Sequence, residues 1–332
     1  MFYLPLPTVK ELDDYHSLIE KSIQDALDLV ILNVDVKAYL TKERIKQIIV
    51  DPPDKLLGYH NDVMNLLING FESAEFKTFR HVRKKKNKTP EDDLLIARYR
   101  IAEQLEKVFN YGKFISGSKS FSYDFAIQLG QQTCTYCNRI YAQTIIAKNK
   151  STGTIDDTGR ITRPDFDHWY PKSKYPVLAL SYFNLIPSCG ICNSSIKGDA
   201  DFNLATHVHP YVHEPGQDFN FSYDLKDAYR NNVKIKCVKN SKIDNTLKAF
   251  KIEEVYNAHS DLELKDLLDM RYKYSENYLD TLLNRTFKSL DISNQEAYRL
   301  AFGVEEEKKN YHKRAFSKFK IDILRELGIS IS

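Results

Sequence analysis

The sequence feature that most constrains the fold is a pair of Cys-x-x-Cys motifs, Cys134-Thr-Tyr-Cys137 and Cys189-Gly-Ile-Cys192. Each motif can place two thiolates on one side of a tight turn, and two such turns supply the four soft ligands of a tetrahedral zinc ion. Because the motifs lie far apart in the chain, one ion would hold two distant segments together. The sequence therefore predicts a structural zinc site with these four cysteines as its ligands.

Disulfides and a thioredoxin-like redox pair are the alternative interpretations of these cysteines. The chain begins Met1-Phe-Tyr-Leu-Pro-Leu-Pro, which has neither the basic start nor the apolar run of a secretory signal. We therefore expect a cytoplasmic protein in a reducing compartment, where zinc is favoured over disulfides. The presence of a second Cys-x-x-Cys pair argues against a redox role. The fifth cysteine, Cys237, alternates with lysines and is expected to be a small apolar residue of a strand.

An Asp-His pair, Asp167-His168, lies between the two cysteine motifs. Phosphodiester hydrolysis needs a base that activates water and a divalent cation that neutralises the charge developing on the phosphate. On a strand, successive side chains point to opposite faces, so the carboxylate can face a hard cation while the imidazole faces the water. Asn193 and Lys197 are four residues apart and are predicted to share one face of a short helix that begins near Pro187-Ser188.

These motifs resemble the HNH, or ββα-metal, endonucleases. The residues that match are Asp167-His168, Asn184-Leu185 and the stretch from Cys189 to Gly198. The resemblance implies that Asp167 and Asn193 bind a catalytic Mg²⁺ or Mn²⁺, with His168 as the general base. It also implies that Asn184 orients His168 through the backbone and that the products carry 5′-phosphate and 3′-hydroxyl ends. Lys197 joins this catalytic set, although three residues rather than the commoner two separate it from Asn193.

Three stretches are similar, more narrowly, to the HNH subunit of the Septu anti-phage defence system: residues 136–138, 166–173 and 184–189. Together the motifs span about a fifth of the chain, so the resemblance concerns the catalytic module and not its flanks. It implies DNA as the substrate, a setting in anti-phage defence or restriction, and an ATPase or sensor subunit as a partner.

Two other functions are compatible with these residues. The chain could be a non-catalytic zinc-stapled module that binds nucleic acid, or a nuclease subunit that is active only with an ATPase partner. His168 taken alone could be a core histidine, and Asn184 could cap a turn. Trp169 and Tyr170 are expected to pack in the core rather than stack on bases. The intact Asp-His pair and the final asparagine favour the catalytic interpretation.

Composition and charge bound the rest of the chain. With 332 residues, 42% of them hydrophobic and 28% charged, the chain can bury a proper core. We expect a mostly helical α+β protein with an HNH core at residues 126–215, a helical region at 1–125, and a hairpin plus helices at 216–332. No apolar run is long enough for a membrane span. The net charge of +3 is uninformative, but basic clusters at 80–88 and 308–320 are candidate contacts for phosphate groups.

Local patterns predict the individual elements. Thr8 and Glu11 form a capping box, Asp51-Pro-Pro-Asp54 is a break, and the polar segment 149–160 is the expected hairpin tip before the Asp167-His168 strand. The histidines His207, His209 and His213 are expected to lie in loops near the active site rather than to form a second metal site. Period-two alternation predicts a hairpin from Phe219–Tyr223 and Val233–Val238. Helices are predicted from Thr8, over Asn61–Leu67, Thr89–Val108, Tyr123–Leu129, Asp261–Leu283, Ser293–Phe302 and Ser317–Leu327.

Overall fold

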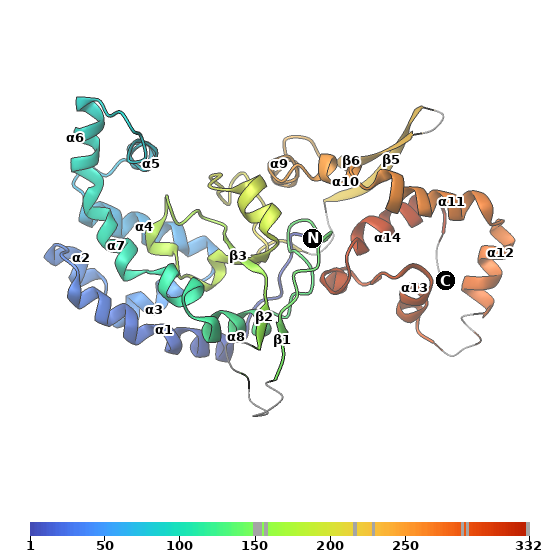
Figure 1. The fold of residues 1–332 in the computed structure, drawn as a ribbon, viewed down its shortest axis with the longest axis horizontal. Coiled ribbons are helices and arrows are strands. Elements are labelled where there is room, and N and C mark those ends of the chain that lie inside the picture. Colours follow the sequence, from blue (N-terminus) through green and yellow to red (C-terminus); the bar gives the residue numbers. More distant parts are fainter. Residues whose placement is uncertain are drawn as a thin grey trace.

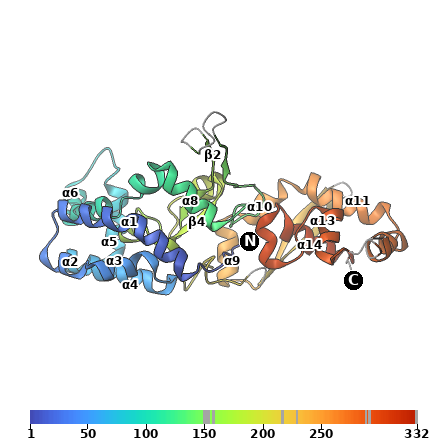
Figure 2. The same cartoon turned by 90° about the horizontal axis from the view of Figure 1, so that it is seen from below.

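The computed structural model describes residues 1–148, 155, 159–214, 218–227, 230–286, 289 and 292–329. It has the predicted α+β composition, because helices dominate and the strands of the described residues form three two-stranded sheets. The molecule is elongated, with the first helices at one end, the last helices at the other and the segment that carries the cysteine motifs between them (Figures 1 and 2). In the described part of the chain, no helix has the length and apolar character needed to cross a membrane.

The N-terminal helices begin at the predicted capping box. The Thr8 hydroxyl accepts a hydrogen bond from the backbone N–H of Glu11, whose carboxylate accepts one from the N–H of Thr8. The predicted break at 51–54 is confirmed, because one helix ends just before it and the next begins within it. The helices are α1 (Val9–Leu29), α2 (Val34–Tyr39), α3 (Lys42–Val50), α4 (Pro53–Leu67), α5 (Ser73–Val82), α6 (Pro90–Tyr99), α7 (Glu103–Val108) and α8 (Lys119–Leu129).

The helix predicted over 89–108 is interrupted. A 3-10 turn at Arg100–Ala102 separates α6 from α7. Tyr99 fixes the inward face of α6, because its ring is fully buried against Phe76 and Phe79 of α5. Apolar spacing by itself predicts Leu94 on that face, but the residue is 73% exposed. It lies five residues before Tyr99 and is therefore about 140° away around the helix.

The central part contains the sheets that carry the candidate site. Strand β1 (Ile145–Ile146) pairs with β2 (Arg160–Thr162), and the predicted hairpin tip between them falls largely outside the described residues. Strand β3 (Asp165–His168) pairs antiparallel with β4 (Leu185–Ser188), and the helical segment η5 (Ile191–Lys197) follows β4 directly. Pro187 and Ser188 therefore belong to the strand and do not start the helix as predicted. A two-stranded sheet tolerates this proline, because the missing N–H can face outwards.

The C-terminal part begins with the predicted hairpin, in which β5 (Phe219–Asp227) pairs with β6 (Arg230–Cys237). The single long helix predicted over 261–283 is wrong. Tyr274 is extended and the hydroxyl of Ser275 accepts a hydrogen bond from the N–H of Tyr278, so a new helix starts there instead. The helical elements are α9 (Lys242–Ala249), α10 (Ile252–Asn257), η6 (Ser260–Leu264), α11 (Lys265–Lys273), α12 (Glu276–Asp280), η7 (Thr281–Thr286), α13 (Asn294–Phe302) and α14 (Ser317–Glu326).

The C-terminal part supports the first cysteine motif through buried hydrogen bonds. The hydroxyl of Tyr256 in α10 donates to the backbone carbonyl of Cys137 at 2.6 Å. The side-chain amide of Asn138 donates to the carbonyls of Tyr311 and Arg314 at 2.7 and 3.1 Å. These bonds pair polar backbone groups of distant segments, so they fix the loop that carries Cys134 and Cys137.

Candidate metal centre and adjoining cleft

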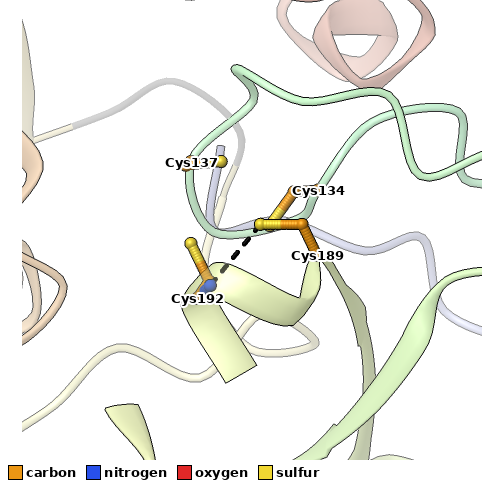
Figure 3. A group of neighbouring side chains, drawn as sticks. All are labelled: Cys134, Cys137, Cys189 and Cys192. Carbon is orange, nitrogen blue, oxygen red and sulfur yellow. Dashed lines mark hydrogen bonds between the residues drawn. The ribbon is translucent and has the colours of Figure 1, made fainter. Parts of the chain in front are cut away.

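The four predicted zinc ligands lie together in the structure. The sulfur atoms of Cys134, Cys137, Cys189 and Cys192 are all within 4.8 Å of one another, and all four residues are buried (Figure 3). A tetrahedral zinc ion with Zn–S bonds of about 2.3 Å separates its sulfur ligands by about 3.8 Å, so a small adjustment of the side chains accommodates the ion. The residues present therefore fit a zinc site with four cysteine ligands.

Each cysteine pair has the geometry of a tight turn. The N–H of Asn138 donates to the carbonyl of Cys134 at 2.9 Å, and Asn138 adopts a positive φ of 49°. In the second motif, the N–H of Cys192 points at the sulfur of Cys189 at 3.5 Å. The first turn precedes β1 and the second opens η5, so zinc would join the loop after α8 to the end of the β3–β4 hairpin.

His168 lies at the end of β3 with its ring held on both sides. Its Nε2 hydrogen-bonds the carbonyl oxygen of Ala179 at 3.0 Å, and the ring packs edge-on against Tyr111 at 4.5 Å between centroids. Burial lowers the pKa of His168 to about 3, reinforced by the nearby Lys172 ammonium. A carbonyl can only accept, so Nε2 carries the proton and Nδ1 is the basic nitrogen of a neutral imidazole.

Asn184 is fully buried and shapes the loop between the two strands. Its side-chain oxygen accepts a hydrogen bond from the N–H of Tyr170 at 2.7 Å. Its amide donates to the carbonyls of Tyr170 and Leu178 at 3.0 and 2.9 Å. Leu178 precedes Ala179, whose carbonyl contacts His168, and the Asn184 carbonyl accepts a hydrogen bond from the N–H of Trp169 at 3.0 Å. Asn184 is therefore connected to the histidine through backbone groups.

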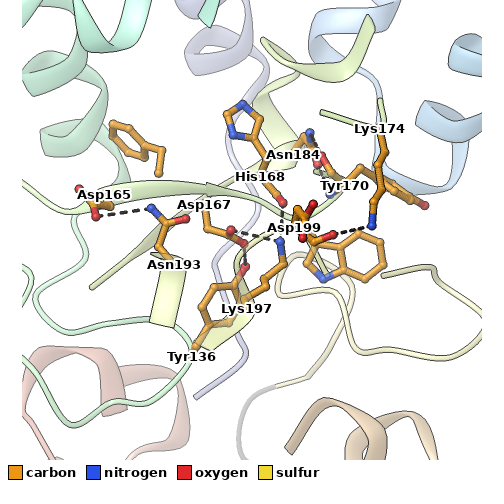
Figure 4. Close-up of polar contacts among 12 residues, drawn as sticks. Tyr136, Asp165, Asp167, His168, Tyr170, Lys174, Asn184, Asn193, Lys197 and Asp199 are labelled. Atoms are coloured by element: carbon orange, nitrogen blue, oxygen red, sulfur yellow. Dashed lines mark hydrogen bonds and ion pairs between the residues drawn. The ribbon is translucent and has the colours of Figure 1, made fainter. Parts of the chain in front are cut away.

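Asp167 lies on the opposite side of β3 from the His168 ring, in a buried polar cluster (Figure 4). Its carboxylate accepts a hydrogen bond from the Tyr136 hydroxyl at 2.6 Å and forms an ion pair with the Lys197 ammonium at 3.1 Å. Lys197 also donates to the carbonyl of His168 at 2.7 Å. Burial raises the pKa of Asp167 and lowers the pKa of Lys197, while the pairing opposes both shifts.

Asn193 is at the mouth of the site, away from that buried cluster. Its side-chain amide donates to Asp165 at 3.4 Å (Figure 4). Asp165, Asp167, His168 and Asn193 line a common cleft of about 420 Å³. The structure therefore brings three of the predicted catalytic residues to one cleft, and it places Asn184 and Lys197 behind that cleft as buried supports.

The segment η5 is a π-helix, and this accounts for the unusual spacing of Asn193 and Lys197. The N–H of Gly198 donates to the carbonyl of Asn193 five residues earlier, at 3.0 Å. A π-turn accommodates one more residue than the corresponding α-turn. The extra residue is therefore absorbed by the wider turn, and Lys197 still reaches Asp167.

Three residues of the site were not singled out from the sequence. Tyr136 lies inside the first cysteine motif, and Asp165 shares a strand face with Asp167 by period-two alternation, so both had a local signal. Tyr111 precedes α8 and contacts His168 only through tertiary packing, and nothing in its local sequence indicates that contact.

The predicted loop histidines do not line the His168 cleft. His207 stacks on Phe202 with ring centroids 4.2 Å apart, and His209 packs on Trp169 at 4.5 Å. They border a different hollow together with His213. Among the described residues, the only group of three or more His, Cys, Asp or Glu side chains close enough to share a metal ion is the four cysteines.

Both basic clusters are partly neutralised within the molecule. In the first, Arg80 pairs with Glu106, while Arg83 pairs with Glu103 at 2.8 Å. Lys85 of the same run pairs with Asp92, at 3.0 Å. In the C-terminal cluster, Lys318 is 1% exposed and pairs with Asp322 at 2.9 Å. Lys318 is therefore a structural residue, and the expectation that it contacts DNA is wrong.

The fold and site thus define a mostly helical α+β protein with a four-cysteine cluster that fits zinc and an adjoining polar cleft. No protein-family model matches the chain, and no solved structure matches it. The chain is similar to Septu protein PtuB of Bacillus thuringiensis, with 36% identity over 63 residues, which cover 19% of this chain and 24% of PtuB. It is also similar to protein ea31 of Escherichia phage lambda, with 25% identity over 130 residues, or 32% of this chain and 44% of ea31. The matched stretches span less than half of either relative.

Proposed function

We propose that this protein is a metal-dependent HNH endonuclease that hydrolyses phosphodiester bonds in DNA. The observation that carries the proposal is the neutral imidazole of His168, fixed by a backbone carbonyl at the edge of a cleft that also contains Asp167 and Asn193. Two antiparallel strands followed by a helical segment supply these residues, which is the order of elements in a ββα-metal core.

In this proposal, Nδ1 of His168 takes a proton from the attacking water. Asn184 holds the loop that bonds Nε2, so the basic nitrogen keeps a fixed direction. Asp167 and Asn193 would hold the Mg²⁺ or Mn²⁺ ion, which neutralises negative charge on the phosphate and the leaving oxygen. The Asp167 carboxylate has about four acceptor positions, and the two hydrogen bonds that it accepts leave room for a cation. Lys197 pairs with this carboxylate and so opposes the rise in the pKa of Asp167 that burial causes.

The biological setting is part of the same proposal. The local similarity to Septu protein PtuB supports a role in anti-phage defence or restriction, with an ATPase or sensor subunit as a partner. We further infer a cytoplasmic protein with three units, at residues 1–125, 126–215 and 216–332. The rival functions are a non-catalytic zinc module and a nuclease subunit that works only with its partner.

The test is cleavage of supercoiled plasmid in Mg²⁺ or Mn²⁺ by wild type, His168→Ala and a control, His81→Ala, which removes an exposed histidine of α5. Zinc content is measured on all three proteins. We expect cleavage by wild type and the control, and a loss of at least about 10²-fold in His168→Ala, because general-base catalysis contributes this much. Retained cleavage in His168→Ala would show that the base has been misassigned. A zinc-loaded wild type that is inert even with its defence partner would support the non-catalytic module.

A further inference from the structure

Three clefts adjoin one another around the candidate site. The central cleft, which contains His168, shares Tyr111, Lys172 and Ser173 with a second cleft of about 210 Å³. It shares Arg163 and Asp165 with a third cleft of about 340 Å³. The three hollows therefore form a series, and one cationic side chain lies at each of the two junctions.

Both junction cations lie over aromatic rings, and Arg163 is also held by backbone carbonyls. The ammonium of Lys172 lies 4.3 Å from the ring centroid of Tyr111, and the guanidinium of Arg163 lies 5.1 Å from that of Phe166. Arg163 also donates to the carbonyl oxygens of Pro164 and Ile115, at 2.7 and 3.5 Å. Such contacts fix the position of a cation without cancelling its charge.

Unlike several residues of the two basic clusters, the two junction cations have no carboxylate partner among the described residues. Within the described ranges, no salt bridge joins Lys172 or Arg163 to a carboxylate, whereas Arg80, Arg83 and Lys318 are each paired. Glu106, the acid that lines the second cleft together with Lys172, is paired with Arg80. An uncompensated cation on a concave wall attracts anions, and two of them in series favour an extended polyanion.

We propose that the three clefts form one track for a nucleic-acid strand, in which Lys172 and Arg163 contact backbone phosphates on either side of the scissile phosphate. The proposal rests on the proposed nuclease function, because it takes the His168 cleft as the point of cleavage. In the central cleft, the acidic residues would hold the metal ion at the scissile phosphate. Lys172 and Arg163 would neutralise the phosphates on either side of it.

The experiment measures the binding of a DNA duplex to the His168→Ala protein, without added Mg²⁺ or Mn²⁺, across a range of salt concentrations. Lys172→Met and Arg163→Met are introduced singly, together with Arg163→Lys, which keeps the charge. The control is Lys113→Met, because the Lys113 ammonium also lies over a ring, that of Phe114 at 5.6 Å, but borders none of the three clefts. Thermal unfolding of each variant shows that the fold is intact.

We expect Lys172→Met and Arg163→Met each to weaken binding about tenfold. Each should also lower the slope of log affinity against log salt by about 0.9, the value for one lost phosphate contact. Lys113→Met and Arg163→Lys should leave the slope unchanged. The track is disproved if the parent protein binds the duplex but both methionine variants keep its slope, or if the parent does not bind the duplex. If the wild type is inert even with its defence partner, but both methionine variants lower the salt slope of binding, the nuclease function is rejected and the track stands.

Discussion

At the residue scale, Tyr136 links the candidate zinc site to the cleft. It lies between Cys134 and Cys137, its ring stacks on Phe250 at 4.1 Å, and its hydroxyl donates to Asp167 at 2.6 Å. We predict that Tyr136→Phe keeps its zinc but lowers the free energy of unfolding by about 2 kcal/mol, because a buried carboxylate loses a donor. In the proposed nuclease it should also lower cleavage about tenfold, because Asp167 is less firmly positioned.

Urea unfolding, zinc content and plasmid cleavage together check this prediction. The matched control is Tyr175→Phe, which removes a hydroxyl that donates to another carboxylate, Asp201, at 2.8 Å and away from the cysteines. The control should lose some stability but keep full activity. An unchanged free energy of unfolding in Tyr136→Phe would show that its hydrogen bond to Asp167 contributes nothing to the folded state.

At the element scale, a zinc ion in the cysteine cluster would fasten two segments that share no sheet among the described residues, the loop after α8 and the start of η5. We predict that wild type binds about one zinc per chain and that Cys192→Ser loses the ion and several kcal/mol of stability, because metal binding is coupled to the folding of its site. The matched control is Cys237→Ser, in strand β6, which should retain zinc. Metal analysis and urea unfolding measure both effects, and a zinc-loaded Cys192→Ser protein of unchanged stability would refute the prediction.

At the scale of the whole molecule, buried histidines predict sensitivity to acid. His60 in α4 and His209 beside Trp169 are each 2% exposed, and burial lowers the pKa of both to about 3. The unfolded chain binds protons below its ordinary histidine pKa of about 6.5 while the native state does not, so stability is complete above that pH and falls as the pH drops towards 3.

At pH 5, each of these two histidines should lower the free energy of unfolding by about 2 kcal/mol. The loss is about 1.4 kcal/mol per pH unit, and pH 5 lies roughly 1.5 units below the ordinary histidine pKa of about 6.5. Urea unfolding at pH 7 and pH 5 measures the difference. His60→Phe should lose less stability on acidification than wild type, by about the same 2 kcal/mol, whereas His81→Ala, at an exposed position, should behave as wild type. Equal acid sensitivity in His60→Phe and wild type would contradict the assignment.

Local sequence was sufficient wherever one short stretch carries its own physical signal. The capping box at Thr8, the short helix predicted from Ser293 and the alternation of the 219–238 hairpin were confirmed, because hydrogen-bonding caps and a period-two pattern act within a few residues. Local apolar spacing was insufficient for the 261–283 segment, where the cap at Ser275 ends one helix and starts another. It also misjudged Leu94, since the packing of Tyr99 decides the inward face of α6.

The sequence by itself was enough to predict that the four cysteines form one cluster and to select the polar residues between them. Residue type and spacing, on which those predictions rest, can be read directly from the sequence. Only the tertiary structure decided how these residues are used: Tyr136 and Lys197 on Asp167, Asp165 beside Asn193, and Tyr111 against His168. The reason is physical. Burial, ion pairing and ring contacts depend on segments that meet only when the chain has folded, so no local pattern encodes them.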